Sequence, residues 1–266
     1  MSSSDRVALV TGATGAIGEA IARGLAERGF SVVITARSEA KALATLERLA
    51  AAVPDADLRA ELVELSNTES IAALRARFSG PLHVLVNDAA ECPRERTETD
   101  EGVERQWATN VLGYYRMLLA FEDLLSESAP ARVVNVASYW AGGLDLSDPE
   151  FRERPYDNDS AYRQSKQANR MLAAGLAPRL AKEGITINAC HPGDVPSKLA
   201  SDLGFGGSAS PDQGAATPVF LAADPSVEGE TGGYYARRKR EDDPFTTDAS
   251  AVARLLELCA SYGQAD

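Results

Sequence analysis

Short apolar runs alternate with amphipathic segments along most of this 266-residue chain. The runs are rich in valine, isoleucine and leucine, which is typical of strands buried on both faces of a parallel sheet. The segments between them repeat apolar residues at helical spacing. We therefore predict strands at 7–10, 31–36, 58–64, 82–87, 132–137 and 185–190, and helices at 17–28, 39–52, 70–78, 100–125, 161–182, 213–222 and 248–262.

This alternation predicts an α/β fold, a doubly wound parallel sheet with helices on both faces, built as a single domain over residues 1–266. Ligands of such sheets bind beyond the carboxyl ends of the strands. Polar residues that follow the predicted strands should therefore share one rim. They are Thr11, Arg37, Asn87, Ser138 and His191.

The formal net charge of −12 argues against a nucleic-acid or anionic-membrane partner, because both require a positive surface. No stretch approaches the length of a membrane span, and the N-terminus has no apolar leader. The three cysteines are far apart and the chain has two histidines, so we expect neither a disulfide framework nor a metal site. We expect a cytoplasmic protein.

Two charged segments are interpreted as surface loops. The acidic residues of 145–153 resemble a metal cluster, but Arg152 and Arg154 lie among them. The basic run 237–240 is followed by three acidic residues, which favours a solvated, self-neutralising loop over a nucleic-acid patch.

The glycine-rich turn 11–18, with the sequence TGATGAIG, lies between the first predicted strand and the first predicted helix. Glycines there allow a tight turn and close backbone approach, and a helix N-terminus favours a pyrophosphate. After the second predicted strand, Arg37 and Ser38 stand where a carboxylate would accept bonds from a ribose 2′-hydroxyl. A guanidinium and a hydroxyl suit a 2′-phosphate instead, so we predict NADP rather than NAD.

Tyr162 and Lys166 are four residues apart in a predicted helix, so their side chains share one face. A nearby cation favours the phenolate, and we expect it to lower the pKa of Tyr162. Such a tyrosine could transfer a proton near neutral pH.

Several motifs follow one another in chain order: the turn 11–18, the run NDAA at 87–90, Asn110, Ser138, the Tyr162/Lys166 pair and the run PGDVPS at 192–197. With this set the chain resembles the short-chain dehydrogenase/reductase family over nearly its whole length. The runs 161–169, 188–193 and 232–235 are most similar to its retinol-dehydrogenase-like and carbonyl-reductase branch. The resemblance implies a Rossmann-type fold.

The resemblance also implies residue roles. Tyr162 would be the general acid/base, Lys166 would lower its pKa and bind the nicotinamide ribose, Ser138 would bond the substrate oxygen, and Asn110 would hold a relay water. The residues implied to bind NADP are Thr11, Gly12, Thr14, Gly15, Ala16, Ile17, Gly18, Arg37, Ser38, Glu64, Leu65, Asn87, Ala89, Tyr162, Lys166, Pro192, Gly193, Val195 and Ser197.

Two segments near the rim should bound the substrate. We predict a lid at 197–212, rich in glycine and serine, and a polar insertion at 139–159. Leu144, Leu199, Leu203 and Phe205 suggest a small apolar or aromatic substrate, and Trp140 is placed to touch it.

The function predicted is hydride transfer between NADP(H) and a carbonyl or alcohol. One alternative is an epimerase, dehydratase or lyase that retains its cofactor, suggested by the G-x-x-G-x-x-G spacing. Another is a non-catalytic dinucleotide-binding protein, suggested by Asp88 and Ala90, which replace a family Asn and Gly. The helices at 100–125 and 161–182 are possible contact surfaces of a homodimer or homotetramer.

Overall fold

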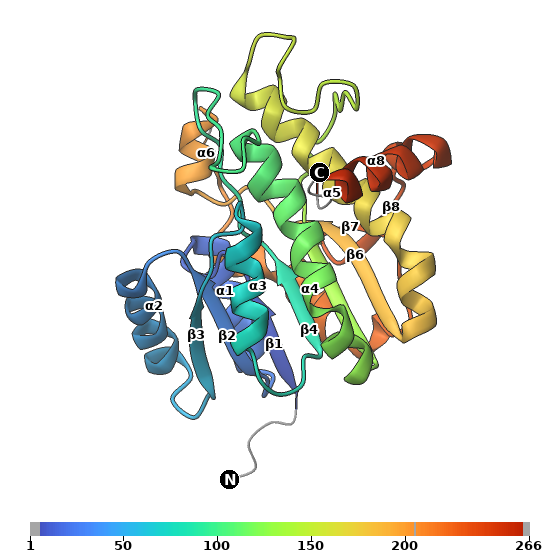
Figure 1. Cartoon of the computed structure of the whole chain (residues 1–266). Helices are drawn as coiled ribbons and strands as arrows, with labels where there is room; N and C mark the ends of the chain where they lie inside the picture. The colour runs from blue at the N-terminus through green and yellow to red at the C-terminus, as the bar shows by residue number, and fades with distance from the viewer. Residues whose placement is uncertain (1–5, 205, 263–266) are drawn as a thin grey trace.

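The computed structural model describes residues 6–204 and 206–262, and its centre is an eight-stranded sheet (Figure 1). The strands lie in the order β3-β2-β1-β4-β5-β6-β7-β8. Their bounds are Val7–Val10 (β1), Ser31–Ala36 (β2), Leu58–Leu62 (β3), Val84–Asn87 (β4), Ala131–Val136 (β5), Ile185–His191 (β6), Tyr234–Ala236 (β7) and Lys239–Glu241 (β8). Every pairing is parallel except that of β7 with the edge strand β8.

The predicted doubly wound fold is confirmed. The chain runs outward from β1 to β3 and then crosses back to β4, which pairs with the other side of β1. This reversal opens a crevice beyond the carboxyl ends of β1 and β4, where such sheets bind their ligands. All six predicted strands are present, although β3 ends at Leu62, two residues before the predicted end.

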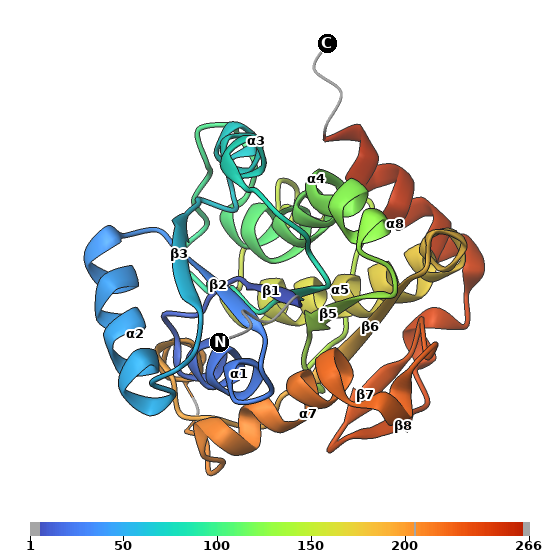
Figure 2. The ribbon, with the colours of Figure 1, turned by 90° about the horizontal axis from the view of Figure 1, so that it is seen from below.

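Helices cover both faces of the sheet, with α1 and α7 on one side and α3, α4 and α5 on the other (Figure 2). Two separate hydrophobic cores fill these layers, which is why the strands are apolar on both faces. The bounds are Ala16–Ala26 (α1), Glu39–Ala52 (α2), Thr68–Arg77 (α3), Gly113–Glu127 (α4), Asn158–Leu180 (α5), Lys198–Asp202 (α6), Pro211–Ala223 (α7) and Ala249–Ser261 (α8).

The helix predicted from residue 100 begins later. Residues 107–112 form a π-helical segment that leads into α4. Glu104 explains the shift, since its buried carboxylate accepts hydrogen bonds from the amides of Gln106 and Trp107 and so caps the segment there. An isolated bridge between Glu98 and Glu104 holds the preceding residues out of the helix.

The basic run 237–240 forms a hairpin rather than an irregular loop. Arg237 and Arg238 have positive φ angles and make the tight turn between β7 and β8. All three residues of β8 are exposed, so the prediction that these charges are solvated is confirmed for this strand. Three-residue strands are too short to show a period of two, so the sequence pattern missed both of them.

The long helix α5 is buried along most of its length because α8 packs against it. A Cβ added at Gly175 would lie 2.6 Å from Cγ1 of Val252, so the two helices approach closely there. Within the described residues, no helix is both long and apolar enough to cross a membrane.

Candidate active site

Tyr162 and Lys166, both on α5, line a pocket. Tyr162 is 7% exposed and Lys166 is 2% exposed. The Lys166 Nζ donates a hydrogen bond to the main-chain oxygen of Val136 at 2.9 Å. It lies 5.5 Å from the centroid of the Tyr162 ring, as expected for side chains one helical turn apart.

The expected lowering of the Tyr162 pKa was wrong. Burial raises the pKa of Tyr162 well above its usual value, because the phenolate would lose its hydration. A hydrogen bond from Ser138 acts in the opposite direction but is the smaller effect. Burial also lowers the pKa of Lys166, which weakens the cation on which the prediction relied.

Ser138 lies two residues beyond the end of β5, on the same rim as the carboxyl ends of β1 and β4. Its Oγ accepts a hydrogen bond from the amide of Trp140 at 3.0 Å, and it lies near enough to the Tyr162 phenol to act on the pKa of that group. The hydroxyl is therefore held beside the phenol by the turn that follows the strand. The hydroxyl groups of Ser138 and Tyr162 are therefore close together. A site that stabilises charge on a substrate oxygen requires such hydrogen-bond donors.

Asn110 lies in the π-helical segment, and such segments are common at functional sites. Its side chain exchanges two 3.0 Å hydrogen bonds with the backbone of Glu91 and donates to Ser165 at 3.3 Å. Asn110 is thus fully bonded and anchors the residues that follow β4. Its role in a water relay stays a prediction.

The glycine-rich turn packs directly against the segment after β4. Gly12 has φ of +71°, and a Cβ there would lie 2.6 Å from the Cα of Ala89. A Cβ at Gly18 would lie 2.4 Å from the carbonyl oxygen of Gly12. Thr11 joins the two segments, because its Oγ1 accepts hydrogen bonds from the amides of Asp88 and Ala89. The turn leaves bare backbone open at the N-terminus of α1, as pyrophosphate binding requires.

Arg37 lies at the opposite end of the pocket, after β2. Its guanidinium pairs with Glu91 at 3.1 Å and is 3.8 Å from Glu64. The Arg37 side chain is 59% exposed, and exposed ion pairs contribute only about 0–1 kcal/mol. The guanidinium is therefore available to an incoming phosphate.

One pocket of about 340 Å³ runs from Arg37 to Lys166. The predicted residues that line it are Gly12, Thr14, Gly15, Ala16, Ile17, Arg37, Glu64, Leu65, Ala89, Tyr162, Lys166, Pro192 and Ser197. Predicted residues outside its lining are Thr11, Gly18, Ser38, Asn87, Asn110, Ser138, Gly193 and Val195. Thr11 and Asn87 hold strand ends in place, the latter by a bond from its amide to Asn135.

Lys198 and Leu199 of the predicted lid also line the pocket. The lining residues that the sequence interpretation did not assign to the site are Thr35, Ala36, Val63, Asp88, Ala90, Glu91, Thr109, Val136 and Ala137. Five of them come after a strand end, which is the one sequence signal these five share: Val63, Asp88, Ala90, Glu91 and Ala137. Asp88 was noted only as a departure from the family pattern. Its place in the pocket depends on how the β4 end packs against the turn at α1.

Three aromatic side chains lie close together next to Ser138. Tyr139 and Trp140 are 52% and 41% exposed, directly after Ser138. The ring of His191 packs edge-on against Tyr139 at 4.7 Å, and burial lowers the pKa of His191 to about 4. This histidine is neutral at neutral pH and extends the aromatic surface.

The predicted lid contains α6, which the sequence interpretation missed. Ser197 caps α6 by accepting a hydrogen bond from the amide of Ala200. The side chain of Asn158 donates to the main-chain oxygen of Asp202 and so ties α6 to the start of α5. Phe205 lies outside the described residues.

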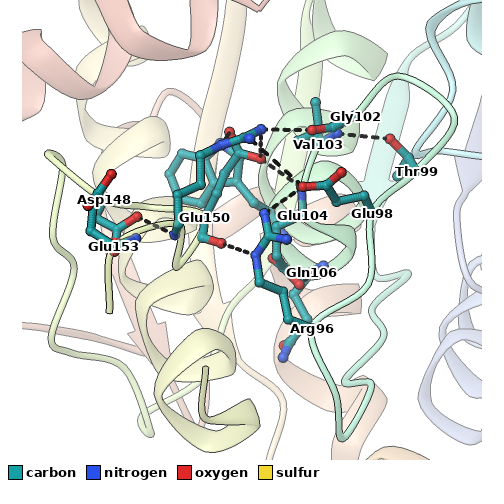
Figure 3. Close-up of polar contacts among 12 residues, drawn as sticks. Arg96, Glu98, Thr99, Gly102, Val103, Glu104, Gln106, Asp148, Glu150 and Glu153 are labelled. Carbon is teal, nitrogen blue, oxygen red and sulfur yellow. Dashed lines mark hydrogen bonds and ion pairs between the residues drawn. The ribbon is translucent and has the colours of Figure 1, made fainter. Parts of the chain in front are cut away.

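Asp148 and Glu150 of the insertion are buried, whereas Glu153 is exposed, so the expectation of a surface loop is wrong for these two carboxylates. Figure 3 shows the polar contacts around them. The carboxylate of Asp148 accepts hydrogen bonds from three amides of residues 152–154. Glu150 accepts bonds from the amide of Glu104 and the hydroxyl of Tyr262, and its main-chain oxygen accepts from Arg96. These bonds use the carboxylates to fix the insertion. Within the described residues, no three acidic, histidine or cysteine side chains are arranged to hold a metal ion.

Comparison with known proteins agrees with this geometry. The family model described as short chain dehydrogenase matches residues 6–204. A probable oxidoreductase of Streptomyces antibioticus is 34% identical over 95% of each chain, and mouse retinol dehydrogenase 13 is 30% identical over 97% of this chain and 86% of its own. The solved structure of actinorhodin polyketide ketoreductase with NADPH has a TM-score of 0.69 and 26% identity, over 88% of this chain and 96% of that one. The chain therefore belongs to the short-chain dehydrogenase family, whose members are oxidoreductases that use a nicotinamide cofactor.

Proposed function

We propose that this protein is an NADP(H)-dependent carbonyl reductase or alcohol dehydrogenase acting on a small apolar or aromatic molecule. The observation that carries the proposal is the single pocket that joins Arg37 to Tyr162 and Lys166. Its glycine-rich wall fits a dinucleotide, because Gly12 and Gly15 line the pocket at the N-terminus of α1, where bare backbone can bind a pyrophosphate. The cofactor would supply the hydride, and the protein would position it and stabilise charge on the substrate oxygen.

Tyr162 would donate the proton to the substrate oxygen during reduction. Its raised pKa suits this direction, because the phenol keeps its proton at neutral pH until a developing oxyanion accepts it. Ser138, beside the same phenol, would turn its one O–H to that oxygen and donate a second hydrogen bond to it. Lys166 would bind ribose hydroxyls with its ammonium group, which the Val136 carbonyl holds in position.

The preference for NADP rests on Arg37. A 2′-phosphate would accept paired hydrogen bonds from the guanidinium, which are stronger than the exposed contacts to Glu64 and Glu91. Related solved structures include complexes with NADPH and NADP, which supports this choice.

The apolar or aromatic substrate class is supported by the exposed Tyr139 and Trp140 next to Ser138 and by Leu199 in the pocket lining. Mouse retinol dehydrogenase 13 is named for retinol, which is a largely apolar molecule. A cytoplasmic location forms part of the proposal, supported by cysteines that are all free. A homodimer or homotetramer also remains a proposal.

The test measures NADPH oxidation with a panel of apolar and aromatic ketones and aldehydes, and compares Tyr162→Phe with wild type. We expect the variant to lose about 10²–10⁴-fold in kcat/KM, the usual contribution of a general acid. The matched control is Tyr114→Phe. The Tyr114 ring also lies 5.5 Å from Lys166 but does not line the pocket.

Three outcomes are informative. Equal activity of wild type and Tyr162→Phe would exclude the proposed mechanism. Substrate conversion without net change in NADP(H) would identify an epimerase, dehydratase or lyase instead. Cofactor binding without turnover of any panel member would favour a non-catalytic dinucleotide-binding protein.

A further inference from the structure

Asp88 places a carboxylate inside the cofactor pocket. It follows β4 directly, and its amide donates a hydrogen bond to Thr11 at 3.0 Å, which fixes the backbone against the glycine-rich turn. The side chain reaches the first turn of α1, since a Cβ at Gly18 would lie 2.8 Å from Oδ2 of Asp88. The carboxylate thus lies beside the helix N-terminus that is suited to the pyrophosphate.

Nothing in the described part of the chain neutralises this carboxylate by direct contact. Among residues 6–204 and 206–262, no donor is hydrogen-bonded to its oxygens and no cation is in ion-pair contact with it. Glu91, on the same pocket wall, differs in this respect. Its carboxylate pairs with Arg37 and accepts a hydrogen bond from the hydroxyl of Thr109 at 2.5 Å.

Four titratable groups face Asp88 from neighbouring elements: Tyr114 on α4, Tyr162 and Lys166 on α5, and Cys190 on β6. Burial raises the pKa values of both tyrosines and of the cysteine, so these three groups are neutral at neutral pH. Lys166 is the cation of this set. Burial raises the pKa of Asp88, and the charge of Lys166 opposes that rise without cancelling it.

We propose that Asp88 takes up one proton from solvent when the dinucleotide binds, so that this carboxyl group makes cofactor affinity depend on pH. The inference rests on the proposed dinucleotide site. Its physical basis is that the pyrophosphate would bring negative charge to the α1 N-terminus, beside a carboxylate that no donor stabilises. Neutralising Asp88 removes the repulsion between like charges.

Proton linkage gives the direction in which the Kd for cofactor changes with pH. If the bound form holds one more proton than the free form, the Kd for cofactor rises with pH wherever free Asp88 is ionised. The rise is at most about tenfold per pH unit for uptake of one proton. Replacement of Asp88 by asparagine keeps the shape of the side chain and removes the titration.

The experiment measures the Kd for NADPH by fluorescence titration between about pH 6 and about pH 9 for wild type, Asp88→Asn and Glu91→Gln. We expect the Kd of wild type and Glu91→Gln to rise with pH more steeply than that of Asp88→Asn. The 2′-phosphate of NADPH itself titrates near about pH 6, but it does so equally with every variant. The difference between slopes therefore isolates the protein group.

Calorimetry provides a second measurement that does not depend on a variant folding. NADP⁺ is titrated into wild type in two buffers of different ionisation enthalpy at about pH 8, and the difference in heat counts the protons taken up. We expect net uptake, reduced in Asp88→Asn. Equal pH slopes in wild type and Asp88→Asn, or no proton uptake by wild type, would overturn the inference while leaving the proposed function intact. No binding of either nucleotide at any pH would overturn both.

Discussion

The ammonium group of Lys166 and the phenol of Tyr162 lie on one face of α5, with 5.5 Å between Nζ and the ring centroid, yet the phenol keeps a raised pKa. Burial acts on both groups, and it disfavours the charged form of each. The pair therefore combines a protonated acid with a weakened cation, which suits proton donation to a carbonyl oxygen.

Replacing Lys166 by methionine should reduce kcat/KM by about 10²–10⁴-fold, because the catalytic phenol loses its neighbouring cation and the ribose loses its donor. Steady-state kinetics with NADPH measure the loss, and a fluorescence titration measures cofactor binding separately. The control is Lys198→Met. Lys198 also lines the pocket, but its side chain is 88% exposed and pairs with Asp202. A comparable loss in both variants would contradict a specific role for Lys166.

Arg37 should set the choice between cofactors. We expect Arg37→Ala to raise the Kd for NADPH by about 10–100-fold, the contribution of a charge-assisted hydrogen bond, and to change the Kd for NADH little. Arg105→Ala is the matched control, because Arg105 also lies near Glu91, at 3.5 Å, but does not line the pocket. An unchanged ratio of the two Kd values in Arg37→Ala would exclude the proposed preference.

The buried Glu104 should make stability depend on pH. Burial raises the pKa of Glu104 to about 7 from its ordinary value of 4.5, so between these values the folded protein holds a proton that the unfolded chain has released. The free energy of unfolding should then fall as pH rises through this window, by up to about 1.4 kcal/mol per pH unit relative to Glu104→Gln. Urea unfolding of both proteins across the window measures the difference. If the difference in unfolding free energy between wild type and Glu104→Gln does not change with pH, Glu104 stays ionised in the folded protein.

The contact between α5 and α8 should tolerate no larger side chain at Gly175. We expect Gly175→Leu to lower the free energy of unfolding by about 1–3 kcal/mol, because the new side chain would overlap Val252 and Leu256. Val252→Ala in the same chain should recover part of the loss, and a double-mutant cycle by urea unfolding measures the coupling. If the effects of Gly175→Leu and Val252→Ala on the free energy of unfolding simply add, α8 moves away from the larger side chain without a cost in stability.

The site was predictable where the chemistry depends on local pattern. The turn 11–18 needs glycines because its backbone approaches Ala89, and the spacing of Tyr162 and Lys166 follows from the helical period. Asp88 and Glu91 were recognisable only as residues after a strand. Their proximity to Gly18 and to Arg37 joins segments far apart in the chain, and no local period encodes such contacts.

The sequence alone predicted six of the strands in chain order, the parallel sheet, the glycine-rich turn and the placement of the polar residues that follow the strands on one rim. These follow from periodicity and backbone requirements that act within a few residues. Only the tertiary structure decided the burial of Asp148 and Glu150, the β7–β8 hairpin and the charge state of Tyr162. Each of these depends on how much water the packed fold removes from a group, or on a partner strand, and both are set by residues distant in the sequence.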